Sequence, residues 1–351
     1  MDRKERKGLG SRRVTIKDLA ERLHTTPSTV SRALRDQSGV GEKMRHRIKE
    51  LAAEMDYQPN AVAAGLRKGK SHTIGVIVPR VNRDFFSGVI AGIEEVAYES
   101  RYSVIICQTH DRLDKEKQYV ETLLGTRVDG ILVSLGLETD TYEHFEKVVA
   151  SGTPLIFFDR VPNEMDVSRI LIDDYQGSFR VVRHMIGKGY RRIVHFAGPE
   201  YLNVYRDRKR GYLDALKQSN IPVDEELIIY DSLTIEAGRR SMEELLKKGI
   251  VPDALFSSSD YSALGALLYM QEKGYRIPQD FGVAGFSNEK FTSYIRPSLT
   301  TVDQQSNEMG KYCMNLFLRE VKGDAGPPGK VMLNPEVLFR ESTSRDISSN
   351  K

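Results

Sequence analysis

The stretch that most limits how this chain can fold is residues 14–34, VTIKDLAERLHTTPSTVSRAL, which predicts two short helices in immediate succession. Thr15 precedes the first helix with Asp18 three residues later, a variant of the capping box in which the carboxylate also favours the positive helix end. Thr26 can cap the second helix, with Pro27 in the first turn, where a missing N–H costs nothing. We therefore expect two helices joined by a very short turn.

Each of these helices has an apolar side and a polar side. The apolar residues recur at helical spacing, so each helix can bury a stripe, together with a third helix expected over about residues 42–55. The polar side of the second helix carries short donors and a guanidinium, Arg32, which can hold a guanine edge with two bonds. A helix-turn-helix unit of this kind places its second helix in the major groove of DNA. The residues expected to contact DNA here are Thr15, Ile16, Lys17, Thr26, Pro27, Ser28, Thr29, Ser31, Arg32 and Tyr57, with Lys43, Arg45, Arg47 and Lys49 of the third helix facing phosphates.

The distribution of charge also favours nucleic acid as a partner. Residues 1–70 contain 17 Lys and Arg against 9 Asp and Glu, whereas the rest of the chain contains 35 against 40. Such asymmetry is expected when one small domain meets a polyanion and the body does not. A solubilising basic tail, expected over residues 1–13, would contribute to the same pattern, so the decisive signal is the helix pair.

Two stretches, TIKDLAERLHTTPSTVSRAL and MDYQPNAVAAGLRKGKSHTIGVIVP, resemble the lactose-repressor (LacI/GalR) family of bacterial transcriptional regulators. The resemblance implies a helix-turn-helix domain over residues 14–58, and a hinge helix and linker over 59–71 that order when two subunits meet on the operator. It also implies that Leu66 is a wedge in the minor groove, beside Asn60 and Ala63. An apolar wedge spends about a few kcal/mol of unstacking free energy to bend the duplex. The residues AVAAGLRKGK by themselves would equally suit a linker.

From residue 72 onward, short apolar runs alternate with amphipathic helical stretches. TIGVIVP, YSVIICQT, VDGILVSL and TPLIFFD predict buried parallel strands of one half, and RRIVHFAG, ELIIYDS, DALFSSS and FGVAGFS predict a second half. The predicted fold is an all-α helix-turn-helix headpiece plus an α/β two-lobed, periplasmic-binding-protein-like core with two doubly wound parallel sheets. The expected core covers residues 72–341 and a tail covers 342–351. The first lobe is expected over about 72–171 and 303–328, and the second over about 172–302 and 329–341.

Ligands of doubly wound sheets bind beyond the carboxyl ends of the strands, so a two-lobed core should hold one site in the cleft between its lobes. The strand ends indicate the lining residues, and the resemblance adds Arg208, expected just before a helix that begins near residue 209. Aromatic faces, carboxylates and an arginine together suit a sugar or sugar derivative. The residues expected to bind this ligand are Phe85, Phe86, Asp159, Arg208, Asp260, Phe286 and Ser287.

Parts of this site depart from the pattern common in the family. Ser259-Asp260 stands where Asn-Asp is frequent, and Phe286-Ser287-Asn288 stands where a carboxylate usually follows the aromatic residue. The effector therefore should not be copied from the best-known members. Arg80 and Arg83, expected near the cleft mouth, would also admit an anionic ligand.

Other classes of function find less support. The chain has no GxSxG, P-loop, HExxH or GxGxxG motif, and His195 is expected to be a strand histidine rather than a base, so we expect no enzyme. Cys107 and Cys313 lack metal-ligand spacing and are expected to be buried thiols, and we expect neither a cofactor nor a metal. The core alone would suit a stand-alone sugar-binding protein. The charged start MDRKERKGLGSRR is no export signal, however, and favours the cytoplasm.

These observations predict a sequence-specific transcriptional regulator, a repressor, that binds a pseudo-palindromic double-stranded DNA operator as a homodimer. A small molecule in the cleft would set operator affinity by changing how the subunits meet. A protein coregulator in place of that molecule is the alternative. An apolar stripe at Val89, Ile93 and Val96 would line the dimer face or lie buried on the sheet.

Overall fold

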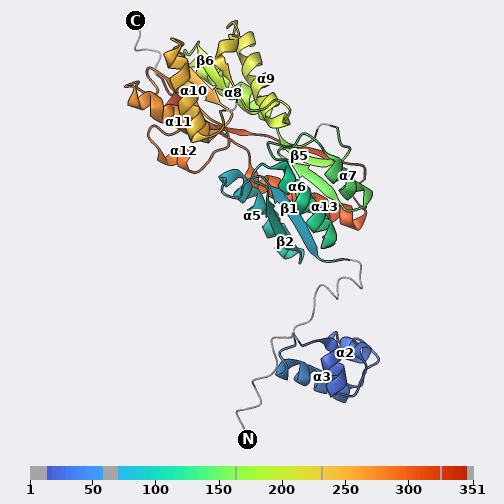
Figure 1. Cartoon of the computed structure of the whole chain (residues 1–351). Helices are drawn as coiled ribbons and strands as arrows, with labels where there is room; N and C mark the ends of the chain where they lie inside the picture. The colour runs from blue at the N-terminus through green and yellow to red at the C-terminus, as the bar shows by residue number, and fades with distance from the viewer. Residues whose placement is uncertain (1–13, 58–69, 163, 231, 325, 346–351) are drawn as a thin grey trace. The chain divides into compact units, whose positions relative to one another are not determined.

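The computed structural model describes residues 14–57, 70–162, 164–230, 232–324 and 326–345 (Figure 1). The chain divides into two compact units between Ser71 and His72. In its described part, the first unit is helical and the second is an α/β core. No helix in the described ranges is both long and apolar enough to cross a membrane. The expected basic tail, 1–13, and nearly all of the expected hinge lie outside the described residues.

The helical unit confirms the expected helices and their caps. Its helices are α1 (Ile16–Arg22), α2 (Pro27–Leu34) and α3 (Glu42–Glu54). The Asp18 carboxylate accepts from the Thr15 backbone N–H at 2.7 Å, which completes a capping box, and Thr26 Oγ1 accepts from the Thr29 N–H at 3.2 Å. The apolar stripes meet in one core made of Leu19, Ala20, Val30, Ala33, Ile48 and Ala52.

Parallel strands form the sheet of the first lobe, in the order β11-β5-β4-β3-β1-β2. They are β1 (Thr73–Val78), β2 (Ser103–Gln108), β3 (Gly130–Val133), β4 (Leu155–Phe158), β5 (Ser168–Ile172) and β11 (Lys330–Leu333). The helices on this sheet are α5 (Asp84–Glu99), α6 (Leu113–Gly125), α7 (Glu143–Ala150) and α13 (Ser306–Lys322). Successive strand residues point to opposite faces, so α5 and α13 cover one face and α6 and α7 the other.

The second lobe is built in the same way around a parallel sheet of order β7-β6-β8-β9. Its strands are β6 (Ile193–Phe196), β7 (Ile228–Ile229), β8 (Ala254–Ser257) and β9 (Gly282–Ala284). Around it lie α8 (Asp174–Gly187), α9 (Asn203–Gln218), α10 (Ile235–Lys247), α11 (Asp260–Glu272), α12 (Phe291–Tyr294) and 3₁₀ turns η1 (Glu225–Leu227) and η2 (Glu341–Thr343). An antiparallel pair, β10 (Thr301–Asp303) and β12 (Glu336–Leu338), completes this lobe, with Val302 and Val337 in its core.

The C-terminal part of the core departs from the expected boundaries. Residues 329–341 were expected in the second lobe, but the strand β11 within this range pairs with β5 and belongs to the first, whereas β12 pairs with β10 in the second. The expected tail also begins later than residue 342, because Ser342 and Thr343 are buried and the Ser342 hydroxyl donates to the Val283 carbonyl at 2.6 Å. Both differences arise from long-range pairing that a short segment cannot encode by itself.

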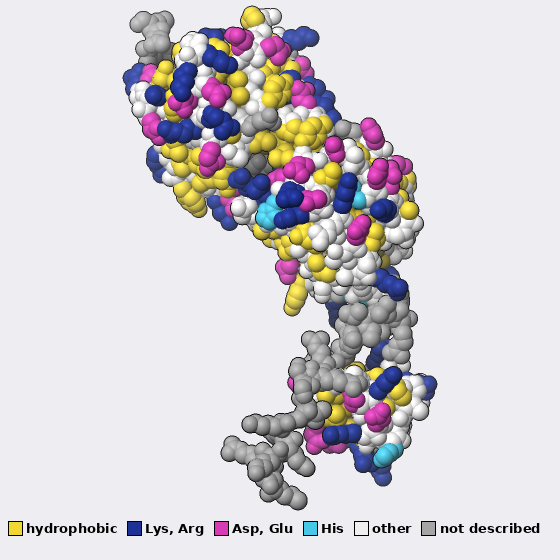
Figure 2. Space-filling model, in the orientation of Figure 1, with side chains coloured by type: hydrophobic (Ala, Val, Ile, Leu, Met, Phe, Trp, Pro, Cys, Tyr) yellow, Lys and Arg dark blue, Asp and Glu magenta, His cyan; other side chains and the backbone are white. Residues whose placement is uncertain are grey.

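The apolar stripe on α5 lies buried against the sheet, which is the second of the two placements expected for it. Val89 and Ile93 are fully buried, and Val96 packs against the same core between α5, α13 and the sheet. The two cysteines are likewise buried, as expected, and both are free thiols. On the face shown in Figure 2, acidic and basic side chains alternate over the core without a large patch of either sign.

Candidate functional sites

The start of α2 is the candidate DNA-contacting edge of the helical unit. Thr26, Ser28 and Thr29 form a cluster of hydroxyls there, with Thr26 Oγ1 2.8 Å from Ser28 Oγ and 2.9 Å from Thr29 Oγ1. Ser28 and Arg32 are exposed, as a groove-reading face requires. Ser31 was expected on the same face, but it is buried at 8 % exposure on the side that packs within the domain.

The remaining expected DNA contacts divide by exposure. Lys17 and Pro27 are exposed, whereas Ile16 and Tyr57 are half-buried and pack against the helical core. Two basic side chains of α3 that were expected to face phosphates make contacts within the helical unit. Arg45 donates to the Gln37 carbonyl at 2.9 Å, and Lys49 binds Asp36 at 2.6 Å. These contacts fix the loop that follows α2. The expected wedge and its neighbours, Asn60, Ala63 and Leu66, lie outside the described residues.

A cavity of about 190 Å³ lies between the two lobes of the core. It is smaller than the roughly 300 to 1,000 Å³ typical of sites for drug-sized ligands, so it suits a compact ligand. Of the expected ligand contacts, Phe85, Phe86, Asp159, Arg208 and Ser287 line it. Further lining residues include Arg80, Arg83, Asp111, Arg160, Tyr205, Ser258, Tyr261, Glu289 and Gln304.

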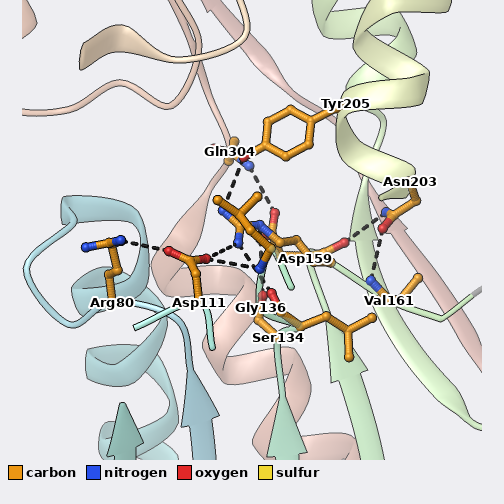
Figure 3. Close-up of polar contacts among 12 residues, drawn as sticks. Arg80, Asp111, Ser134, Gly136, Asp159, Val161, Asn203, Tyr205 and Gln304 are labelled. Atoms are coloured by element: carbon orange, nitrogen blue, oxygen red, sulfur yellow. Dashed lines mark hydrogen bonds and ion pairs between the residues drawn. The ribbon is translucent and has the colours of Figure 1, made fainter. Parts of the chain in front are cut away.

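Asp111 anchors the first-lobe side of the cavity (Figure 3). It follows β2, and its carboxylate accepts from Arg80 Nε at 2.7 Å and from Arg160 Nη1 at 2.8 Å. Burial alone would raise the pKa of Asp111, but the guanidiniums of Arg160 and Arg80 hold it below its ordinary value. The same carboxylate accepts from the Leu137 N–H at 3.3 Å, so it also fixes the loop after β3.

Asp159, at the end of β4, is a cavity carboxylate whose hydrogen bonds from side chains are long. It is buried, and Ser134 Oγ donates to it at 3.3 Å and Gln304 Nε2 at 3.5 Å. The Arg160 backbone N–H also donates to this carboxylate, and Arg160 Nε lies 4.0 Å from it. Burial raises the pKa of Asp159 above its ordinary value, against the opposing charges of Arg160 and Arg208. A hydroxyl donor entering the cavity would satisfy this carboxylate.

Arg208 forms the second-lobe side of the cavity. Its Nε and Nη2 both lie 2.8 Å from Asp174 Oδ1, and Nη1 donates to the Ser258 carbonyl at 2.9 Å. Its guanidinium also lies 3.8 Å from the ring centroid of Phe286. Burial raises the pKa of Asp174 to about 7, although the charge of Arg208 opposes that shift. This arginine is therefore held in one orientation before any ligand arrives.

Two expected ligand contacts are not among the lining residues, although they support them. Phe286 is fully buried beneath the Arg208 guanidinium. Asp260 is also buried; it accepts from Thr301 Oγ1 at 2.7 Å and from the Glu289 N–H at 2.9 Å. Burial raises its pKa to about 6, while the hydrogen bond from Thr301 lowers it.

The sequence prediction missed several lining residues for a local reason. Arg208 was expected just before a helix, but α9 begins at Asn203, so Arg208 lies in the second turn. Tyr205 is three residues earlier on this helix and therefore lines the same cavity, with its hydroxyl 3.2 Å from Arg160 Nη2. Asn203 joins the lobes by accepting from the Val161 N–H and donating to the Asp159 carbonyl, each at 2.9 Å (Figure 3).

A metal site is not evident in the part of the chain that the structure describes, where no group of three His, Cys, Asp or Glu side chains is placed to hold an ion. His195, expected as a strand residue, is fully buried in β6 and stacks between Tyr212 and Phe256. Its Nδ1 lies 3.0 Å from the Phe256 carbonyl, and burial lowers its pKa to about 4. It is a neutral core residue that is not in the cavity.

A helix-turn-helix unit joined to a two-lobed core with an interlobe cavity defines the class of DNA-binding regulators with a periplasmic-binding-protein-like domain. Residues 15–60 match the family of bacterial regulatory proteins, lacI family, and residues 182–343 match the periplasmic binding protein-like domain. The repressor CytR of Escherichia coli strain K12 is 32% identical over 329 residues, which cover 94% of this chain and 96% of CytR. The chain therefore belongs to the LacI family: it is a DNA-binding transcriptional repressor, not an enzyme.

Solved structures of similar sequence support the same family assignment. The Lac repressor dimer bound to operator and the anti-inducer ONPF superposes with a TM-score of 0.81 at 27% identity, over 95% of this chain and 99% of that one. The complex of the transcriptional regulator CelR with cellobiose superposes with a TM-score of 0.72 at 26% identity, over 94% and 100% of the two chains. The predicted fold, a helix-turn-helix headpiece and a two-lobed α/β core, is confirmed.

Proposed function

We propose that this repressor binds a pseudo-palindromic operator as a homodimer and that a sugar or sugar derivative in the interlobe cavity sets its operator affinity. The observation that carries the ligand class is that the buried Asp159 carboxylate, with its long side-chain hydrogen bonds, and the fixed Arg208 guanidinium line one cavity together with the aromatic side chains of Phe86 and Tyr205. A polyol ring stacks on aromatic faces and needs acceptors and donors for its hydroxyls. The cellobiose complex of the similar regulator CelR supports this class.

A second polar group supports a ligand rich in hydroxyls. Ser258 lines the cavity and is buried, and its hydroxyl has no hydrogen-bond partner among the described residues. A buried hydroxyl without a partner costs free energy, which a ligand hydroxyl would recover. Arg80 and Arg83 lie in the same lining, so phosphorylated sugars belong to the candidate set.

For DNA recognition, we propose that the hydroxyls of Thr26, Ser28 and Thr29 and the guanidinium of Arg32 contact the operator from α2. The hydroxyls lie at the helix start, where backbone N–H groups and the positive helix end favour phosphate oxygens. Arg32 is exposed one helical turn from Ser28, in reach of base edges. Thr15, Ile16, Lys17, Pro27, Tyr57 and the residues Asn60, Ala63 and Leu66 remain proposed contacts.

A thermal-shift screen of sugars and sugar phosphates against the full-length protein tests the ligand class. We expect at least one compound to raise the melting temperature, and Asp159→Asn to abolish that shift, because the amide loses an acceptor and gains a donor. Asp140→Asn is the matched control, since Asp140 is an exposed carboxylate outside the lining. A screen without any stabilising compound, or an Asp159→Asn protein that responds like the wild type, would contradict the proposal.

A further inference from the structure

A reciprocal pair of hydrogen bonds joins the two lobes at the edge of the cavity. The Asp84 N–H, at the first residue of α5, donates to Glu289 Oε2 at 3.0 Å, and the Lys290 N–H donates to Asp84 Oδ2 at 2.7 Å. Asp84 belongs to the first lobe, while Glu289 and Lys290 follow β9 in the second. The exchange has the form of a capping box whose two halves come from different lobes, some two hundred residues apart.

The start of α5 depends on this exchange for its cap. The preceding residue, Arg83, makes no side-chain cap hydrogen bond, so Glu289 supplies an acceptor for one of the otherwise unpaired N–H groups of the first turn. The Lys290 ammonium lies 3.5 Å from the Asp84 carboxylate and adds charge attraction in the same place. Separating the lobes would break all of these contacts together.

Arg83 makes a further contact between the same elements. Its guanidinium lies 3.6 Å from the ring centroid of Tyr261, the second residue of α11 in the other lobe. A guanidinium over a tyrosine ring is attracted by the ring quadrupole. Arg83, Tyr261 and Glu289 all line the cavity, so these contacts close one of its sides.

Glu289 lies where a charged carboxylate is unfavourable. The free-energy cost of burying its charge opposes the contact between the two lobes. Glu289 is buried at 3 % exposure, near the carboxylates of Asp84 in α5 and Asp260 in α11. Burial raises the pKa of Glu289 to about 7; the neighbouring Asp260 and Asp84 charges also raise it, while the Asp84 N–H and Arg83 lower it. Opening the lobes would return this carboxylate to water.

We propose that Asp84, Glu289 and Lys290 form an interlobe clasp that holds the cavity closed and thereby sets how readily an effector enters and leaves. The inference rests on the proposed function only in assigning a regulatory consequence to closure. Asp84 and Glu289 act here as positioning residues, because they fix one lobe against the other and need not touch the effector. The clasp itself is a property of the effector-free protein.

Lobe separation in the full-length, effector-free protein tests this proposal. Spin labels at Glu121→Cys in α6 and Tyr294→Cys in α12, both exposed positions, report the distance between the lobes; the two native cysteines are buried. We expect Asp84→Ala and Glu289→Ala to add a longer distance to the distribution. In Glu289→Ala, hydrogen exchange of the Asp84 N–H at the start of α5 should become about tenfold faster, because this N–H loses its acceptor.

Conservative and matched variants separate the clasp from a general loss of stability. Glu289→Gln retains an acceptor oxygen and should keep the wild-type distance distribution at pH 5, where the Glu289 carboxyl is mostly protonated. Asp114→Ala removes a first-turn carboxylate of α6 whose partners, Arg112 and Lys115, lie in its own lobe, so it should leave the lobe distance unchanged. Lower melting temperatures with an unchanged distance distribution in Asp84→Ala and Glu289→Ala would overturn the proposal. A failed sugar screen would refute the ligand class and leave this result intact.

Discussion

At the scale of single residues, the core buries several carboxylates, and two of them have close, fixed partners. Asp174 is bonded to Arg208, and Asp260 accepts from Thr301 and from a backbone N–H. Removing one partner of a buried ion pair is strongly destabilising because the other charge remains uncompensated.

Glu289 should give the repressor a measurable dependence on pH. Its pKa in the folded protein is raised from an ordinary value of 4.5 to about 7. Because the folded-state pKa is the higher one, its contribution to stability is complete below about pH 4.5 and is lost as the pH rises to about 7. Relative to Glu289→Gln, the wild type should therefore lose unfolding free energy, and show wider lobe separation, between pH 5 and pH 8.

Urea unfolding and the spin-label distances at pH 5 and pH 8 check this expectation. The comparison with Glu289→Gln isolates Glu289 from the other titrating groups near it, Asp84, Arg83, Asp260, Tyr261 and Lys290. The neutral variant should lack this part of the pH dependence. A wild type and a variant whose difference stays constant across this range would refute the assignment.

At the scale of elements, close approach of backbones decides which helices can pair. A Cβ added at Gly92 of α5 would lie 2.0 Å from the Asn307 carbonyl oxygen of α13, and one added at Gly310 of α13 would lie 2.1 Å from the Val89 carbonyl oxygen. Glycine on both helices therefore lets α5 and α13 touch along their backbones. The helix α5, which contributes Asp84 to the clasp and the two phenylalanines of the cavity, packs with α13 in the same core cluster.

Gly92→Ala should destabilise the core, because the new methyl group meets backbone that cannot move aside without separating α5 from α13. We expect the free energy of unfolding to fall by about 1 to 3 kcal/mol. Gly125→Ala is the matched control: Gly125 ends α6, and an added Cβ there has nothing within 4 Å. That change should be neutral or stabilise by up to about 1 kcal/mol. Equal effects in chemical denaturation would contradict the packing argument.

At the scale of the whole molecule, the proposed DNA site and the proposed effector site lie in separate compact units. The proposed DNA contacts lie before residue 71, and the cavity is built entirely from residues after 72. Regulation therefore requires coupling between the two sites. A substitution that impairs binding at one site should leave binding at the other site intact.

Leu66→Ala tests this separation, although residue 66 lies outside the described residues. If Leu66 is the minor-groove wedge, its removal should weaken binding to a selected operator duplex by at least about tenfold, since the cost of bending the DNA is no longer offset. The thermal shift given by a sugar that binds the wild type should be nearly unchanged. Leu66→Met, which keeps an apolar wedge, should restore most of the affinity. Operator affinity can be measured by fluorescence anisotropy. Equal affinities for Leu66→Ala and wild type would refute the assignment of Leu66 as the wedge.

Local signals in the sequence determined much of this protein. The caps at Thr15 and Thr26, the apolar stripes of α1 to α3, and the strand runs of both lobes depend on neighbours within a few residues, so the sequence was sufficient to predict them. The strand ends also indicated Phe85, Phe86, Asp159 and Ser287 as cavity residues, because parallel strands end at a common edge.

Only the tertiary structure decided the rest. Three features depend on contacts between residues far apart in the chain. The strand β11 pairs with β5 of the first lobe, Phe286 and Asp260 lie behind the cavity lining, and Asp84 is hydrogen-bonded to Glu289. Sequence periodicity records which face a segment buries, but not which distant segment buries it. That choice depends on how the whole set of side chains packs, and it exists only in the folded molecule.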